Sequence, residues 1–292
     1  MHFLTAVLQN QRGFYASLVY VLEAMRHGAR FLLPQANRPI DKYWAETREG
    51  GIVEVHLPLW QISGLSETFI RQWQETVTHR SPTAGQDCFS DWDDFLSTLR
   101  PHPADLMLLA KAGALRSFFP NRHQAVWEAA RWNGRHPGAH LLPLPEDTLN
   151  TQLLPPENPR QNAIWEQELL GFPISQSPFQ FWMGAADALG IIPVDQLESY
   201  VGQEVEIQGI IVTTRNHRTL KGKPMKFVTL ADETGLCETV LFPDAYQQFG
   251  YLVSRSTALR ARILVERDAT QSGLSATLQE CTPIPSPAPS CS

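Results

Sequence analysis

The chain has 292 residues, is 43% hydrophobic, and carries a formal net charge of -6 at pH 7. This length and apolar content predict two or three domains with sizeable cores. The acidic balance excludes a protein that binds nucleic acid over its whole surface, so an anionic ligand must contact a local basic segment.

Neither a membrane span nor a secretory signal is expected. No apolar run reaches the roughly eighteen residues that cross a membrane, and Met1–Tyr20 lacks a charged start and a cleavage site. The cysteines are far apart and form no Cys-x-x-Cys pair, which predicts reduced thiols in the cytoplasm rather than disulfides or a zinc site. They are Cys88, Cys237, Cys281 and Cys291.

Residues 1–60 are predicted to form a helical segment with a short β pair. Apolar residues between Phe3 and Leu8 repeat at helical spacing, and a second helix is expected over Leu18–His27. The Ile52–Leu57 stretch, which follows two glycines, is expected to belong to the β pair.

Residues 61–132 are expected to form a helical domain with helix-hairpin-helix turns. The Gly-containing turn Ile62–Glu67 leads into a helix predicted over Ser66–Thr76, so backbone N–H groups at the helix start would face a DNA phosphate. A second such turn lies in Leu109–Leu115, although its glycine also fits a helix C-cap. The candidate phosphate contacts are Gly64, Leu65, Ser66 and Gly113.

The acidic run Asp91-Trp-Asp-Asp94 is the cluster that suggests a metal site. Ser90 or Asp91 directly precedes an apolar-periodic run and would cap a helix, whose positive end favours the acids. Asp93 points away from the side that Asp91 and Asp94 share. We therefore predict helix capping, and we expect no metal ligand, no catalytic residue and no cofactor in this chain.

Residues 133–192 are expected to connect the helical part to the last domain. Asn133–Arg160 is rich in Pro, Gly and His and has few periodic apolar positions, which indicates a linker. His136 and His140 are four residues apart, but Pro137-Gly138 between them argues against a shared helix face for a metal. Ile164–Leu189 is helical and aromatic in character and is expected to pack between domains.

Residues 193–282 contain five short β-like stretches, with a helical stretch between the third and the fourth. This order predicts the Greek-key barrel called the OB-fold, which often binds oligonucleotides, and Gly209 is placed where its first strand can coil sharply. The expected fold class is therefore α+β and multidomain: a helical helix-hairpin-helix-type half, then a five-stranded OB-fold β-barrel, then a disordered tail over 283–292. The predicted strands are Glu204–Val212, Met225–Leu230, Leu236–Phe242, Thr257–Glu266 and Leu274–Gln279, and the helix is Asp244–Tyr251.

A strongly basic segment joins the first two of these strands. Thr213–Phe227 carries five Lys/Arg and one His, and no carboxylate occurs from Ile207 through Ala231. Such a hairpin would bind a polyanion through phosphate neutralisation and counterion release. The alternative is a soluble hairpin whose cations protect an exposed sheet edge.

Side chains near this segment complete the candidate site. Phe227 is expected either to stack on a base or to be buried, whereas Phe242 is expected in the core. Arg260 and Arg262 point outward on the fourth strand, where they either extend the basic groove or are solvated. The candidate nucleic-acid contacts are Arg215, His217, Arg218, Lys221, Lys223, Lys226, Phe227, Arg260 and Arg262.

Separate stretches of the chain resemble, in the same order, one known family. Two groups of stretches are Val205–Gly235 with Val240–Pro243, and Leu109–Leu115 with Asn121-Arg122 and Gln124–Trp127. The others are Phe3–Tyr15, Glu23–Gly28, Leu33–Arg38 and Glu168–Phe172. The family is that of the bacterial C-family DNA polymerases, the DNA polymerase III alpha subunit and its error-prone relatives. The first group resembles the OB domain of these enzymes, and the second resembles their helix-hairpin-helix region.

The resemblance implies the DNA-binding C-terminal portion of such a polymerase, which holds single-stranded template during replication or repair synthesis. The palm of the family, which carries the metal-binding aspartates, would have to precede residue 1, so no polymerase activity is expected from this chain alone. One alternative is half of a split polymerase that is active only with a palm-bearing partner. The candidate protein partners are therefore a palm-bearing polymerase polypeptide or other replisome subunits. Another is an OB-type protein that binds RNA or tRNA.

Overall fold

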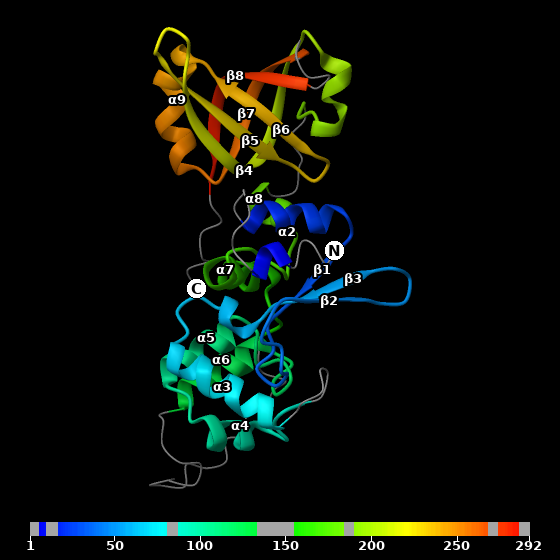
Figure 1. Ribbon diagram of the computed structural model, residues 1–292, viewed down its shortest axis with the longest axis vertical. Helices are drawn as coiled ribbons and strands as arrows, with labels where there is room; N and C mark the ends of the chain where they lie inside the picture. Colours follow the sequence, from blue (N-terminus) through cyan, green and yellow to red (C-terminus); the bar gives the residue numbers. More distant parts are fainter. Residues whose placement is uncertain are drawn as a thin grey trace. The chain divides into compact units, whose positions relative to one another are not determined.

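The computed structural model describes residues 6–9, 17–80, 87–132, 155–183, 190–267 and 274–285, and it divides into two compact units. The helical unit comprises residues 1–12 and 28–176, and the barrel unit comprises residues 13–27 and 177–292 (Figure 1). Most of the expected linker, with its two histidines, and most of the expected tail lie outside the described residues. Within the described ranges, no helix is both long and apolar enough to cross a membrane.

A small sheet belongs to the helical unit. The expected β pair is present as an antiparallel pair of β2 and β3, and β1 joins β3 in parallel, which gives the order β1-β3-β2. β1 escapes prediction because three residues are too few to show an alternation. The strands are β1 Arg30–Leu32, β2 Trp44–Thr47 and β3 Val53–His56.

The rest of the helical unit is built from helices that bury their apolar faces. Trp73, Phe95 and Leu106 come from three different helices and are almost fully buried. Asp91 is the N-cap of α4, and its carboxylate accepts a hydrogen bond from Asp94 N at 2.8 Å, so the predicted capping role is confirmed. The elements are η1 Leu59–Gln61, α3 Glu67–Arg80, α4 Trp92–Leu99, α5 Pro103–Lys111, α6 Arg122–Arg131 and α7 Pro159–Leu170.

A fully buried ion pair joins α6 to α7. The guanidinium of Arg122 donates to the Glu166 carboxylate at 2.8 Å, and neither side chain is accessible to solvent. Glu166 also accepts hydrogen bonds from the backbone N–H groups of Ile174 and Ser175. A charge is tolerated in a core only when it is paired and hydrogen-bonded, so these contacts fix the two helices to each other.

The barrel unit contains a closed barrel of five strands in the order β4-β5-β6-β8-β7. Neighbouring strands are antiparallel except for β6 and β8, which are parallel, and α9 connects the third strand to the fourth. This connectivity confirms the predicted OB-fold. The elements are α2 Ser17–Arg26, α8 Pro178–Met183, η3 Val194–Tyr200, β4 Glu204–Arg218, β5 Pro224–Ala231, β6 Leu236–Leu241, α9 Pro243–Arg255, β7 Ala258–Arg267 and β8 Leu274–Ile284.

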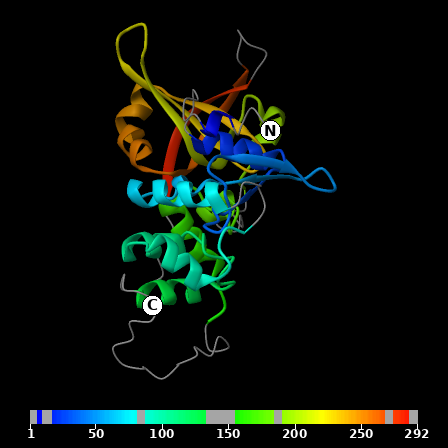
Figure 2. The same ribbon diagram turned by 60° about the horizontal axis from the view of Figure 1, so that its bottom comes forward.

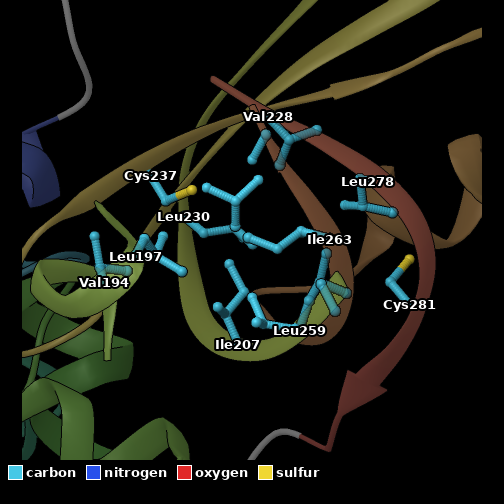
Figure 3. Packing of buried hydrophobic residues seen from close by; sticks show 14 of the residues in the cluster. Val194, Leu197, Ile207, Val228, Leu230, Cys237, Leu259, Ile263, Leu278 and Cys281 are labelled. Atoms are coloured by element: carbon cyan, nitrogen blue, oxygen red, sulfur yellow. The ribbon is translucent and has the colours of Figure 1, made fainter. Parts of the chain in front are cut away.

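Alternate residues of the strands fill this barrel (Figure 3). Ile207, Leu230 and Ile263 are fully buried at its centre, as the alternation of their strands predicts. β4 pairs first with β7 and then with β5, and it changes partner near Gly209. A Cβ atom on Gly209 would lie 3.0 Å from the carbonyl oxygen of Ala231, so glycine permits the coil expected at this position.

Candidate nucleic-acid interface

The basic segment forms the end of a long two-stranded ribbon. β4 does not stop at Val212, as expected, but continues to Arg218, which pairs with Pro224 at the start of β5. The sequence does not reveal this extension because the outer part of the ribbon is exposed on both sides and lacks the alternation that marks a half-buried strand. In both orientations of the ribbon diagram the hairpin projects beyond the body of the barrel (Figures 1 and 2).

The turn at the tip of the ribbon is held by its own backbone. Thr219 N donates to Lys223 O, and Gly222 N donates to Thr219 O, both at 2.8 Å. Gly222 has a φ of 74°, a left-handed conformation that glycine adopts without strain. The loop between Arg218 and Pro224 is therefore a defined turn that carries two lysines at a fixed place.

Cations of the ribbon are exposed, and the three nearest its tip have no acidic partner among the described residues. Arg215, His217, Arg218, Lys221 and Lys223 are all exposed. Among the described residues no ion pair involves Arg218, Lys221 or Lys223, and the Arg218 guanidinium donates instead to the carbonyl oxygen of Gly222 at 3.2 Å. The tip therefore carries an uncompensated positive charge that would attract an anionic polymer.

Lys226 has a different role from the one expected. Its side chain is only 4% exposed, and its ammonium group donates to the Ser254 hydroxyl of α9 and lies 5.8 Å from the centre of the Tyr246 ring. Burial lowers the pKa of this lysine. The residue therefore anchors α9 to the barrel and is removed from the proposed interface.

Arg260 and Arg262 point outward, as predicted, but each meets a carboxylate. The Arg260 guanidinium donates to Glu206, and Arg262 lies 3.3 Å from Glu280. Both arginines lie on β7, which pairs with the first half of β4 and with β8 rather than with the basic ribbon. Their charge is locally balanced. The alternative that they are solvated therefore describes them better than a role in the basic groove, and the structure adds their pairing with acids.

The outer face of β4, β5 and β6 places polar and aromatic side chains in rows. Arg215 is opposite Phe227, and Thr213 is opposite Thr229, which in turn is opposite Glu238. Phe227 is half-buried and meets the His217 ring edge-to-face at 6.1 Å between centroids. The ribbon therefore leads directly onto a surface with an aromatic ring next to an arginine, a combination that suits nucleotides.

Phe242 was expected in the core, and this prediction is wrong. The side chain is 47% exposed, because Phe242 is the N-cap residue of α9 and lies just after the last core position of β6. A strand-ending aromatic at a helix start is not held to either face of the sheet by the alternation of the strand.

α2, from the N-terminal part of the chain, borders the same face. The Arg26 guanidinium donates to the carbonyl oxygens of Asp232 and Gly235 in the turn between β5 and β6. Val19 of α2 then forms one wall of a cleft of about 330 Å³, whose other walls are the rows of β4, β5 and β6. Sequence reasoning missed this cleft because a helix and a barrel more than 170 residues apart in the chain share no local signal.

The first helix-hairpin-helix turn has its phosphate-binding donor already occupied. Gly64 adopts a φ of 88°, as a tight turn requires. Ser66 N and the Ser66 hydroxyl each donate to the carboxylate of Asp105 at 2.8 Å, and Asp105 is buried. A carboxylate therefore takes the place that a phosphate would need at the start of α3, and Gly64, Leu65 and Ser66 are removed from the proposed interface.

The second turn is a helix cap. Gly113 N donates to Ala110 O and Ala114 N donates to Leu109 O, the paired bonds of a Schellman motif at the end of α5. Gly113 has a φ of 75°, and a Cβ atom there would lie 2.7 Å from the Arg122 guanidinium. The C-cap alternative is thus the one the structure contains, and the buried turn offers no free surface to a phosphate.

The chain is similar in sequence to error-prone DNA polymerases from different bacteria. The chain is 28% identical over 261 residues to an error-prone DNA polymerase of Idiomarina loihiensis, a match that covers 87% of this chain and 24% of the relative. It is 27% identical over 263 residues to an error-prone DNA polymerase of Mycobacterium tuberculosis, covering 89% of this chain and 23% of that protein. The chain spans about a quarter of the length of these relatives. This similarity confirms the expected resemblance to C-family DNA polymerases. No protein-family model matches the sequence.

Solved structures resemble part of the chain more distantly. The mitochondrial single-stranded DNA-binding protein Rim1 of S. cerevisiae is 12% identical, with a TM-score of 0.25, and the match covers 28% of this chain and 95% of that chain. Asparaginyl-tRNA synthetase from Pyrococcus horikoshii is 16% identical, with a TM-score of 0.28, and the match covers 34% of this chain and 23% of that chain. The barrel type is established by its own strand order and connectivity.

Proposed function

We propose that this chain, whose sequence is similar to that of error-prone DNA polymerases over about nine-tenths of its length, holds single-stranded DNA on its OB barrel. The basic ribbon of β4 and β5 contacts the sugar-phosphate backbone, and the outer face around Phe227 receives bases. The observation that carries the proposal is the set of exposed, uncompensated cations at the ribbon tip, in a protein that is acidic overall.

The physical basis is the release of counterions from the strand. Each phosphate neutralised by Arg218, Lys221 or Lys223 frees condensed cations, so affinity falls as salt rises, with a slope of about -0.7 per contact for a single strand. Arg215 lies further along the ribbon beside Phe227, so a backbone that follows the cations brings its bases to the aromatic ring. The site therefore has both a charged track and a stacking surface.

Nucleotide addition would then be the task of another part of the machinery. Two-metal phosphoryl transfer requires carboxylates that converge on Mg²⁺. The acidic run around Asp91 caps α4, and Asp94 pairs with Arg80 at 2.6 Å, so these acids are used structurally. In the proposed function this chain positions the template, and a palm-bearing polypeptide supplies the catalytic metal site.

The test is a binding measurement with labelled oligonucleotides of about 16 nucleotides, the upper site size of one OB-fold. Fluorescence anisotropy is recorded for single-stranded DNA, the matching duplex and the equivalent RNA between about 50 and 200 mM salt. We expect the tightest binding to single-stranded DNA, and weaker binding at higher salt. No binding at low salt would refute the proposal, and tighter binding to RNA would replace it with the RNA-binding alternative.

A further inference from the structure

We propose that the cleft between α2 and the outer face of β4, β5 and β6 holds one unstacked nucleobase and selects bases that present an amino group. The inference rests on the proposed function, because it concerns the strand that the barrel would bind. It adds base preference at a named pocket, which backbone contacts alone do not provide.

The walls of the cleft suit a flat aromatic ring. Val19 is buried in α2, Phe227 is half-buried on β5, and Leu236 of β6 is 45% exposed at the edge. The cleft volume of about 330 Å³ is at the lower end of the range for small-molecule sites. Arg26 fixes α2 to the turn between β5 and β6, so the wall formed by Val19 has a defined position.

The polar lining of the cleft is chemically asymmetric. Thr213, Thr229 and Glu238 form one row across the three strands, and all three line the cleft. Threonine hydroxyls both donate and accept hydrogen bonds, whereas an ionised carboxylate only accepts. Within the described part of the chain, Glu238 has no ion pair and no side-chain hydrogen bond, so its acceptor capacity is unused by the protein.

An unused carboxylate on this face discriminates between bases. The amino group of cytosine donates to a carboxylate, as glutamate and aspartate do when they read cytosine N4. Thymine presents an oxygen at the same ring position, which would meet Glu238 as one acceptor facing another. The neighbouring Arg215 lines the cleft from the next row, where it can contact the phosphate of the inserted nucleotide.

The experiment compares oligo-dC with oligo-dT of equal length on the full chain, at a mildly alkaline pH where cytosine is uncharged. We expect oligo-dC to bind at least about fivefold more tightly, the lower end of the discrimination that a specific base contact provides. In the Glu238→Gln variant the side-chain amide both donates and accepts, so the ratio should fall toward one without loss of oligo-dT affinity. Glu233→Gln is the matched control, because Glu233 is exposed in the adjacent turn and does not line the cleft.

The outcomes separate this inference from the proposed function. Binding of both oligonucleotides with equal affinity overturns the base pocket and leaves strand binding intact. A preference for oligo-dC that persists in Glu238→Gln also overturns it, as does a preference that the Glu233→Gln control removes. Failure of both oligonucleotides to bind refutes the proposed function itself.

Discussion

Removing the charge at the ribbon tip is the most direct perturbation of the proposed site. The variant Arg218→Ala, Lys221→Ala, Lys223→Ala deletes three exposed cations that make no ion pair among the described residues. With about 0.7 counterions released per phosphate contact, the loss of three contacts should make the slope of log K against log salt shallower by about 2. At 0.1 M salt this corresponds to an affinity lower by up to about 100-fold, and the difference should nearly vanish at 1 M.

The assay is a salt titration of single-stranded DNA binding by fluorescence anisotropy, with circular dichroism to confirm that the variant is folded. The control is Arg260→Ala, Arg262→Ala, Arg267→Ala, which removes the same charge from exposed positions of β7. Because Arg260 and Arg262 are paired with acids, the control should change the slope much less. Equal slopes for the wild type and the ribbon variant, or equal losses in both variants, would refute the reasoning.

Three further predictions concern stability, measured as the free energy of unfolding in urea. Asp91→Ala removes the cap of α4 and should cost about 1 kcal/mol, whereas Asp91→Asn should retain most of it. Arg122→Met leaves Glu166 charged and buried and should cost about 3–5 kcal/mol, and adding Glu166→Gln should recover part of this loss if the pair is the cause. Burial raises the pKa of the Cys237 thiol from 9.0 to about 12, so the folded state keeps this proton where the unfolded state loses it, and stability present below pH 9 declines above it. The fall between pH 8 and pH 10 should be about 1.4 kcal/mol smaller in Cys237→Ala, and parallel pH profiles would contradict the assignment.

The barrel could be predicted from sequence because each of its strands carries its own signal. In β7 the buried residues Leu259, Ala261, Ile263 and Val265 alternate with more exposed ones, and the sequences that flank the strand contain glycine or polar residues. The outer half of β4 carries no such signal, because a strand that is exposed on both faces has no buried side that requires apolar residues at every second position. Its charge pattern still located the ribbon, which is why a basic hairpin was predicted although the extension of β4 to Arg218 was not.

Residue roles that depend on long-range contacts could not be predicted in this way. Lys226 belongs to the same basic run as Lys223. The alternation of β5 places it on the inward face with Val228, but the Ser254 hydroxyl that accepts its hydrogen bond lies on α9 and has no local signal. Ser66 lies in a turn whose sequence is typical of phosphate binding. Its backbone N–H, however, already donates to the carboxylate of Asp105, which is 39 residues away in the chain. In both cases a distant side chain decides whether a polar group is available to a ligand.

The burial of Lys226 limits the number of phosphates that the ribbon can neutralise. Once Lys226 is excluded as buried, the Lys/Arg side chains that remain exposed between β4 and β5 are Arg215, Arg218, Lys221 and Lys223. If each neutralised one phosphate of a single strand, the slope of log K against log salt would be about -2.8. A measured slope clearly steeper than this would require cations outside the ribbon, in the helical unit or in segments beyond the described residues. A slope near this value that falls toward -0.7 in the tip variant would assign essentially all backbone contacts to the ribbon.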